Sequence, residues 1–413
     1  MPAALLLLSG LHCLVDAYAA LVQPLWPDLE RVIVPAGGSI TVSYTLWSLA
    51  TSVSQLGFGY WADRTGKRGL IWMGALLGVP CMSAVGLVES PWLLNGLLIL
   101  GGLGTAAFHP EAAALAGSTL PRHRARAMSI FAVGGFLGQA IGPFSSGALT
   151  TAHGLPALIW FLPFGLLTLA MFASTALWSI PLRAEEPHPS DPPTTTTTGT
   201  TGGQRLTFQE MVRGQERHLL FLLLVGILRA LPATGTPVAL AYAIKAQGGT
   251  NEEIGWLQSM FLGGIGIGGL GCAILGGRLR EKTMLAHVPW LVVPVLLMLP
   301  RLPGGSWGQA LIVALAGFLL GAVGPVMVGY GQRLLPRGQR VASSITMGVT
   351  YGLAGVLVAG LLAAFQRADC PERVFDLFAV TVALSCLLCV RLREPEEFSR
   401  QLPLDPPPAS SSR

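Results

Sequence analysis

Long runs of uncharged residues recur along the chain and constrain its fold more than any other feature. A helix of about 20 apolar residues crosses a hydrocarbon core of about 30 Å, and in lipid a segment must pair all of its own backbone polar groups, as a helix does. Twelve runs approach that length: 4–27, 40–61, 69–88, 91–118, 126–151, 155–181, 217–244, 252–276, 284–301, 306–334, 340–366 and 372–391. The sequence therefore predicts an all-α membrane protein with twelve transmembrane helices.

The charge content agrees with this class of protein. Only 11% of the residues are charged, whereas a soluble domain carries about 25%. The first run has no basic segment ahead of it and contains His12 and Asp16. We therefore expect a retained helix there, and not a cleaved secretory signal.

The positions of the cations predict the orientation of the chain in the membrane. If the N-terminus is cytoplasmic, the loops and helix ends on that side, with the C-terminal tail, hold 20 of the 26 Lys and Arg residues. Such an excess is typical of cytoplasmic loops. We expect both termini to be cytoplasmic in the cell (inner) membrane, and the net charge of +5 then needs no nucleic acid partner.

A change in composition and an internal repeat divide the chain into two halves. The tract EEPHPSDPPTTTTTGTTGGQ cannot form a core and is typical of a linker. Leu120-Pro121-Arg122 recurs as Leu335-Pro336-Arg337, and at the same offset Pro110 matches Pro325. We predict two six-helix pseudo-repeats, residues 1–182 and 217–393, joined by a flexible cytoplasmic linker, 183–216, and followed by a cytoplasmic tail, 394–413.

The loop after the second run carries a motif with a family resemblance. The stretch GYWADRTGKRG resembles the loop between helices two and three of the major facilitator superfamily, whose fold has twelve helices in two halves. Glycines in this loop let two helices approach closely, and an aspartate can accept hydrogen bonds at a neighbouring helix N-terminus. The resemblance implies a conformational latch made by Gly59, Asp63, Arg64, Gly66, Lys67 and Arg68. The alternative is that these charges only set the topology.

The fifth run contains GQAIGPFSSG, which resembles the antiporter motif of exporters in the same superfamily, with Ser146 in place of a glycine. Small residues at this spacing permit close helix contact, and proline can bend the helix. The resemblance assigns the motif to Gly138, Gly142, Pro143 and Gly147. Generic helix packing is the alternative explanation.

Five titratable or charged residues lie well inside the predicted spans. Charges at this depth are expensive, so they usually face a protein interior or an aqueous cavity and mark a transport pathway. They are His12, Asp16, His109, Glu111 and Arg229. Tyr18, Gln23, Gln55 and Gln139 are candidate cavity residues.

Each of these groups has a functional and a structural interpretation. Desolvation favours a neutral buried acid, which makes Glu111 a candidate proton carrier; Asp16 is a candidate proton or substrate group. Arg229 matches an anionic group such as a phosphonate or carboxylate, because a guanidinium binds such oxygens in pairs. The alternative is that Arg229 neutralises one of the acids, and that His12 and His109 are ordinary hydrogen-bonded interior histidines.

The spacing of His12 and Asp16, the triplet His109-Pro110-Glu111 and the step Leu228-Arg229-Ala230 give a closer resemblance. These features resemble those of the fosmidomycin-resistance branch of the superfamily, whose members are bacterial drug exporters. The resemblance implies an antiporter that exchanges protons for a small drug or metabolite by alternating access.

Two other functions stay open from the sequence. One is proton-coupled uptake of an organic anion on the same scaffold, and the other is transport of a divalent metal by the histidines and acids. The sequence contains no pattern that indicates an enzyme, a bound cofactor or a resident metal. We expect a monomer whose partners are protons, a small-molecule substrate and the lipid bilayer.

Overall fold

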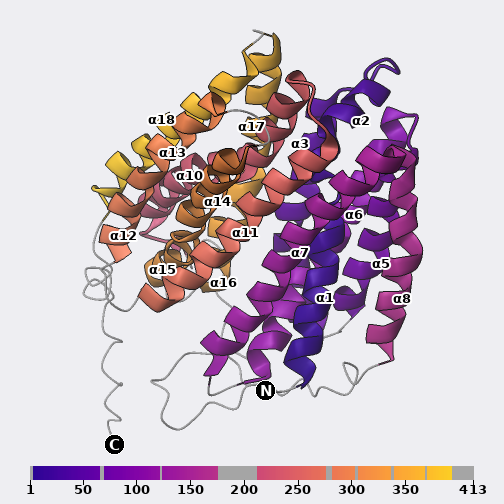
Figure 1. Cartoon of the computed structure of the whole chain (residues 1–413). Coiled ribbons are helices and arrows are strands. Elements are labelled where there is room, and N and C mark those ends of the chain that lie inside the picture. The colour runs from indigo at the N-terminus through magenta and orange to yellow at the C-terminus, as the bar shows by residue number, and fades with distance from the viewer. Residues whose placement is uncertain are drawn as a thin grey trace, which may run out of the picture.

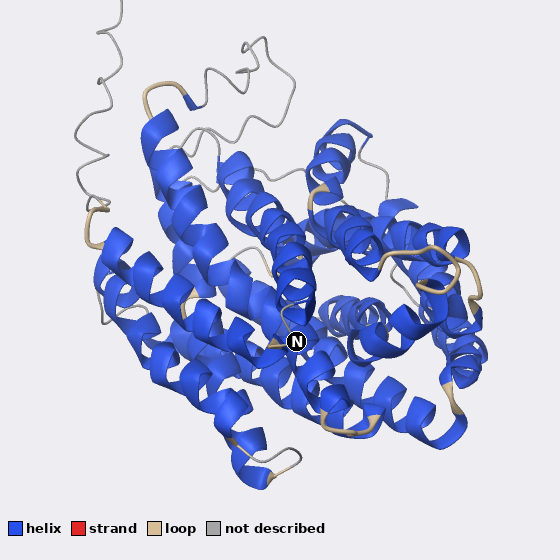
Figure 2. Cartoon of the chain, turned by 90° about the horizontal axis from the view of Figure 1, so that it is seen from above, coloured by secondary structure: helices blue, strands red, loops and turns tan. Residues whose placement is uncertain are grey.

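A computed structural model describes residues 3–65, 69–120, 123–174, 212–275, 281–302, 306–335, 339–367 and 370–392. All regular secondary structure in these residues is helical (Figure 2). The predicted linker, except for its last five residues, and the predicted tail lie outside the described residues. The division at 182 and 217 therefore stays a prediction.

The N-terminal half contains eight α-helices and three short 3-10 segments in its described residues. In chain order they are α1 (Ala3–Ala20), η1 (Gln23–Leu25), α2 (Trp26–Ile33), α3 (Ile40–Ser52), α4 (Ser54–Thr65), α5 (Gly69–Ala84), η2 (Val85–Leu87), α6 (Pro91–Ser118), α7 (Arg124–His153), η4 (Leu155–Trp160) and α8 (Phe161–Ala173).

The regular elements in the described residues of the C-terminal half are also all helical, with one π-helical segment. Its elements are α10 (Glu216–Ala246), α11 (Asn251–Leu275), α12 (Glu281–His287), η6 (Val288–Leu291), α13 (Val292–Met298), η7 (Leu299–Arg301), α14 (Trp307–Gly321), α15 (Gly324–Leu334), α16 (Gln339–Ser343), η9 (Ser344–Val349, the π-helix), α17 (Thr350–Arg367), η10 (Pro371–Arg373) and α18 (Val374–Cys389).

Ten helices in the described part of the chain are long and apolar enough to cross a membrane. The two remaining predicted runs form shorter helices. Run 40–61 is interrupted at Val53, between α3 and α4, and run 372–391 gives α18, a 16-residue helix. The chain is thus a multi-pass membrane protein, and the count of twelve crossings stays a prediction.

The boundary of the first predicted span falls short of the observed helix. The run was expected to end at residue 27, where Pro24 and Pro27 occur. In the structure the chain continues through η1 and α2 to Ile33. Both prolines lie in the first turn of their elements, where a missing N–H costs nothing.

The two matched prolines of the internal repeat have different local structures. Helix α6 continues through Pro110 without a break. In the second half, the corresponding segment is interrupted at Ala322 and Val323, and Pro325 begins the first turn of α15. A proline is tolerated at the start of a helix because its missing N–H has no partner there.

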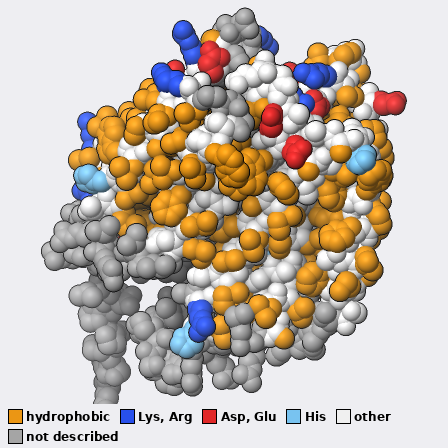
Figure 3. All heavy atoms as spheres, in the orientation of Figure 1, with side chains coloured by type: hydrophobic (Ala, Val, Ile, Leu, Met, Phe, Trp, Pro, Cys, Tyr) orange, Lys and Arg blue, Asp and Glu red, His pale blue; other side chains and the backbone are white. Residues whose placement is uncertain are grey.

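The two halves lie side by side, and four helices make most of the contact between them (Figure 1). Helix α7 packs against α1 within its own half and against α11 of the other half, and α3 packs against α17. The surface between the two ends of the molecule is largely apolar on the face seen in Figure 3. Trp92 and Trp307 are 86% and 76% exposed, as expected for side chains that face lipid and its interface.

Candidate functional site

Four polar side chains from three helices meet inside the N-terminal half. His12 and Asp16 lie four residues apart on α1, and His109 of α6 completes a triangle with them. His12 Nε2 lies 3.4 Å from Asp16 Oδ2, His109 Nε2 lies 3.2 Å from Asp16 Oδ1, and the two Nε2 atoms are 3.3 Å apart. Gln139 of α7 donates to Asp16 Oδ2 at 3.0 Å. We call His12, Asp16, His109 and Gln139 the polar cluster.

The polar cluster lies near the middle of the membrane-spanning helices. At a rise of about 1.5 Å per residue, His12 and Asp16 are about 14 to 20 Å from the start of α1. His109 is about 14 Å from the end of α6. These depths correspond to the centre of a hydrocarbon core of about 30 Å.

Two members of the cluster, His12 and Asp16, are buried, whereas the His109 side chain is 26% exposed. Asp16 is 3% exposed and His12 is 6% exposed. The His12 ring stacks on Phe131, with ring centroids 4.1 Å apart, and Phe108 lies on another side at 5.6 Å. A Cβ at Gly135 would lie 2.4 Å from the His12 ring and 3.0 Å from Asp16 Oδ2. The absence of a side chain at Gly135 is therefore what lets α7 approach the cluster.

Backbone carbonyl groups fix the hydrogen-bonding state of both imidazoles. His12 Nδ1 lies 2.9 Å from the Phe131 carbonyl oxygen, and His109 Nδ1 lies 2.7 Å from that of Thr105. A carbonyl oxygen only accepts, so each Nδ1 is assigned as the donor. Both Nε2 atoms are then turned toward Asp16 and toward each other. Sequence reasoning found the two histidines but not these carbonyl groups, because the backbone leaves no residue-type signal.

Three members of the polar cluster form a set of ligand atoms that also suits a divalent cation. His12, Asp16 and His109 each offer one ligand atom, and these atoms lie within 4.8 Å of one another. Each imidazole donates its other ring N–H to a carbonyl, as metal-binding histidines commonly do. The residues therefore fit a proton or a borderline metal ion.

Glu111 lies on α6 beyond Pro110 and is 9% exposed. Two residues along a helix turn a side chain through about 200°. Glu111 therefore leaves α6 on nearly the opposite side from His109. Asp16 contacts His109 on one side of α6, whereas Glu111 leaves α6 on the other side.

The structure places Arg229 in the C-terminal half, between α10, α12 and α18. The guanidinium donates to Ser385 Oγ at 3.1 Å, to Cys389 Sγ at 3.2 Å and to the Leu285 carbonyl oxygen. Arg229 is 8% exposed. These partners all belong to its own half of the molecule, away from α1.

Three of the four candidate cavity residues have contacts away from the polar cluster. Tyr18 donates to the Phe161 carbonyl oxygen at 2.5 Å. Gln55, near the start of α4, donates to the carbonyl oxygen of Thr51, near the end of α3, at 2.8 Å. The Gln23 carbonyl accepts from Gln258 Nε2 at 3.1 Å, which joins the two halves. Gln139 is the one among the four that meets Asp16.

The predicted latch is only partly within the described residues. Gly59 lies on α4, where a Cβ would be 3.8 Å from Pro110 Cβ, so α4 packs against α6 beside the His109-Pro110-Glu111 triplet. Asp63 and Arg64 are in the last turn of α4. Gly66, Lys67 and Arg68 lie outside the described residues.

The antiporter-like stretch forms two close helix contacts through its glycines. A Cβ at Gly138 would lie 2.2 Å from the Cys13 carbonyl oxygen, and one at Gly142 would lie 2.4 Å from that of Ala17. Further along α7, a Cβ at Gly147 would lie 2.3 Å from the Asn251 carbonyl oxygen. The motif therefore brings α7 against α1 of its own half and against α11 of the other half, while Pro143 lies within α7.

A polar contact that sequence reasoning missed joins the halves near the ends of α2, α7 and α10. Asp28 Oδ1 lies 3.2 Å from Lys245 Nζ, and Asn251 Nδ2 donates to Asp28 Oδ2 at 2.7 Å and to Thr150 Oγ1 at 3.1 Å. An acid near the end of one predicted span and a lysine near the end of another were the signal for this pair. Their pairing required the relative position of the two halves.

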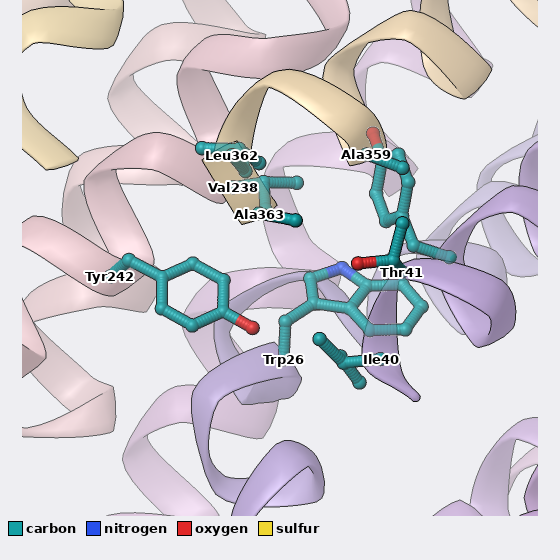
Figure 4. Close-up of a pocket in the computed structure, with 9 residues that line it drawn as sticks. Trp26, Ile40, Thr41, Val238, Tyr242, Ala359, Leu362 and Ala363 are labelled. Carbon is teal, nitrogen blue, oxygen red and sulfur yellow. The ribbon is translucent and has the colours of Figure 1, made fainter. Parts of the chain in front are cut away.

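An apolar pocket lies beside this contact, between α2 and α3 of one half and α10 and α17 of the other (Figure 4). Trp26 and Tyr242 face each other across it. The remaining lining residues are Ile40, Thr41, Tyr44, Val238, Ala359, Leu362 and Ala363.

The family model of the Major Facilitator Superfamily matches residues 8–228, which is more than half of the chain. The chain belongs to the Major Facilitator Superfamily. It is 24% identical over 364 residues to the fosmidomycin resistance protein of Escherichia coli K12, covering 85% of this chain and 84% of that protein. It is 27% identical over 350 residues to the multidrug resistance protein MdtG of E. coli 55989, covering 80% and 79%. These matches confirm the predicted resemblance to the drug-exporter branch.

The fold has a solved counterpart. A bacterial homologue of the human lysosomal transporter Spinster, in an inward-facing and unoccupied conformation, superposes with a TM-score of 0.63 at 18% identity. The match covers 96% of this chain and 95% of that one. The family and the fold identify a membrane transporter of small molecules, which agrees with the expectation that the chain does not belong to an enzyme family.

Proposed function

We propose that this transporter is a proton-coupled exporter that exchanges protons for a small drug or metabolite by alternating access. The observation that carries the proposal is the polar cluster, in which Asp16 and two imidazoles meet inside a membrane-spanning bundle. Buried titratable groups at such depth are expensive and are typical of proton pathways. The names of the relatives, fosmidomycin resistance and multidrug resistance, support a drug-like substrate.

Coupling would follow from competition between proton and substrate for the conformations of the N-terminal half. A proton neutralises the charge of the polar cluster and lowers the cost of burying it. Loss of that proton leaves a net negative charge at Asp16, which is 3% exposed, and this favours the conformation that opens the site. We propose that Glu111, on the other side of α6, assists in this exchange.

The antiporter-like stretch supports the direction of transport. Gly138, Gly142 and Gly147 connect the cluster helix α1 to the opposite half through α7. A change of charge at the polar cluster therefore occurs next to the contact between α7 and α11, along which the two halves must move. We also propose that the protein works as a monomer in the inner membrane with both termini in the cytoplasm, as the distribution of cations favours.

For Arg229 we propose a structural role in place of the substrate-binding role expected from the sequence. Its guanidinium is engaged by Ser385, Cys389 and Leu285 of its own half. Nε and Nη2 are held by these acceptors, and Nη1 is buried without a partner, so the guanidinium is fixed inside its own half of the molecule.

The proposal is tested by transport in everted membrane vesicles under an imposed proton gradient. Resistance profiling of an expressing strain on a mixed panel that includes fosmidomycin first identifies a substrate. Asp16→Asn and Glu111→Gln are then compared with Asp376→Asn, which changes a carboxylate that is 46% exposed in the first turn of α18. We expect proton-driven export to be lost in Asp16→Asn, reduced in Glu111→Gln and retained in Asp376→Asn.

Three results would contradict the proposal in different ways. Proton-driven export that survives both Asp16→Asn and Glu111→Gln would mean that the coupling groups are assigned wrongly. A gradient that drives substrate in the opposite direction would identify an uptake symporter of an organic anion. The donor set of His12, Asp16 and His109 also favours one second candidate, transport of a divalent metal, which vesicles loaded with radioactive zinc would detect.

A further inference from the structure

The apolar pocket between Trp26 and Tyr242 is a candidate binding site that is separate from the polar cluster. We propose that this pocket binds an uncharged molecule that has an aromatic ring and a hydrogen-bond acceptor, and that such molecules are substrates of the transporter. The inference rests on the proposed function, since it names the chemical class of the exported substrate.

Elements from both halves build the pocket near one end of the molecule. Trp26 is the first residue of the short helix α2, and Tyr242 lies near the end of α10. Both are within about 10 Å of the ends of these helices. The end of α2 is opposite to the N-terminus of the chain (Figure 1). The pocket therefore lies between the polar cluster and the side of the membrane on which an exporter releases its substrate.

The indole of Trp26 forms a rigid wall of the pocket. Tyr44 meets this ring with centroids 5.1 Å apart and an angle of 71°, and Trp47 does so at 5.7 Å and 64°. Such edge-to-face contacts are favourable for aromatic pairs, and Trp26 is only 1% exposed. Tyr242 faces the indole from the other half (Figure 4). A planar ring between them would contact an aromatic side chain on each side.

Trp26 also presents a hydrogen-bond donor that has no acceptor. An indole N–H can only donate, and among the described residues none accepts from the buried Nε1 of Trp26. This nitrogen lies on the side of the ring that faces Val238 and Ala363, whose side chains carry no acceptor (Figure 4). A buried donor is costly to leave unpaired. An acceptor on a bound molecule would pair with it, whereas a pure hydrocarbon would not.

The lining of the pocket selects against a charged ligand. Every lining residue in the described part of the chain is uncharged. The acid beside the pocket, Asp28, is already paired with Lys245 at 3.2 Å and with Arg31 at 3.5 Å. A charged ligand buried here would lack a counter-ion, which is unfavourable. The class of substrate that fits is therefore uncharged and aromatic, and not an anionic phosphonate.

Contacts between the two halves close the pocket in this conformation. Tyr44 donates to the Thr234 carbonyl oxygen at 3.4 Å, and Gln258 donates to that of Gln23 at 3.1 Å. The space between the lining atoms is about 270 Å³ including its open mouth, near the lower limit of about 300 Å³ for small-molecule sites. Separation of the halves at this end would divide the lining between α2 and α10 and release a bound molecule.

The pocket is tested with 7-methoxycoumarin, an uncharged bicyclic aromatic molecule with a carbonyl acceptor. Its binding to the full chain in lipid nanodiscs is measured by equilibrium dialysis, with empty nanodiscs as the blank. Two comparison ligands separate the contributions to binding. The 3-carboxylate of 7-methoxycoumarin carries a negative charge on the same rings, and naphthalene has two rings but no acceptor.

Two substitutions, each with a matched control, test the lining of the pocket. Trp26→Phe keeps an aromatic ring but removes the N–H, and Trp92→Phe makes the same change at a side chain that is 86% exposed. Ala363→Leu fills the pocket. Ala364→Leu adds the same side chain at the next position of α17, which is exposed.

We expect one molecule of 7-methoxycoumarin to bind per chain, and the carboxylate to bind about 10-fold more weakly or less. Trp26→Phe should lower the affinity for 7-methoxycoumarin about 2- to 13-fold, as expected for the loss of one hydrogen bond. Its affinity for naphthalene should stay nearly unchanged, which shows that this variant is folded. Ala363→Leu should abolish the binding of both molecules, and Trp92→Phe and Ala364→Leu should retain it.

Binding of 7-methoxycoumarin that survives Ala363→Leu, or that equals the binding of its carboxylate, would overturn the inference. Absence of any binding would also overturn it, because the N–H of Trp26 would then be paired only with water. Proton-driven export of an anionic substrate without binding at the pocket would refute the inference alone. Binding at the pocket without proton-driven export in vesicles would refute the proposed function alone.

Discussion

Replacing Gly138 with alanine tests how closely α1 and α7 are packed beside the polar cluster. The new Cβ would lie 2.2 Å from the Cys13 carbonyl oxygen, whereas ordinary contacts begin at 3.4 Å, a difference of about 1.2 Å (3.4 − 2.2). The obstacle is backbone, so α7 must move as a helix. Such a shift stretches the hydrogen bond from Gln139 to Asp16, now 3.0 Å, beyond the useful range.

The magnitude follows from a matched control. Gly360→Ala adds the same Cβ to a helix at a position where nothing lies within 4 Å, so both variants gain the same helix propensity of up to about 1 kcal/mol. The difference between them isolates overpacking, which costs about 1 to 3 kcal/mol. We expect Gly138→Ala to be less stable than Gly360→Ala by that amount, or about 5- to 150-fold in the folding equilibrium constant.

The assay is reversible unfolding in mixed detergent micelles, followed by proton-driven transport of each variant in vesicles. Gly138→Ala should lose both stability and coupling, and Gly360→Ala should keep both. Equal stability and equal transport in the two variants would refute the close approach of α1 and α7.

Three further predictions follow from the contacts of single side chains. Gln139→Leu removes a hydrogen bond to a charged acceptor and should cost about 1.5 to 3 kcal/mol, measured by unfolding; an unchanged stability would mean that Asp16 has another donor. Asp28→Asn breaks the ion pair with Lys245, and a pair worth about 1 kcal/mol changes the ratio of the two conformations about fivefold; spin-label distances across α2 and α10 measure this, and an unchanged distribution contradicts it. Arg229→Met leaves buried acceptors unpaired and should lower stability by about 1 to 3 kcal/mol without changing KM for the substrate; a raised KM with normal stability would indicate substrate binding.

The sequence predicted the helical membrane architecture because hydropathy and length decide it. Uncharged runs must form helices in lipid, and apart from most of α2 the observed helices overlap the predicted runs. It did not predict the break at Val53 between α3 and α4 or the continuation of the first helix to Ile33. A proline ends a helix in its middle but is tolerated in its first turn, where Pro24 and Pro27 lie. Composition alone does not tell which of these positions a proline occupies.

The sequence predicted how deep each candidate site residue lies along its helix, but not in which direction its side chain points around the helix axis. Depth along a helix follows from counting residues, and it predicts one level for His12, Asp16 and His109, whose side chains are in contact in the structure. Direction around the axis requires an apolar face distinct from a polar face, and a helix that is apolar all round gives no such signal. Arg229 has a similar depth but faces α12 and α18, away from α1.

The glycines of α7 have a consequence for how the sequence of this transporter can change. At Gly134, Gly138 and Gly142 a carbonyl oxygen of α1 occupies the place of a Cβ, and at Gly147 one from α11 does so. A backbone atom is present whatever the sequence of the neighbouring helix, so no compensating substitution in that neighbour makes room. Substitutions that change the substrate range are therefore expected on other surfaces of the transporter.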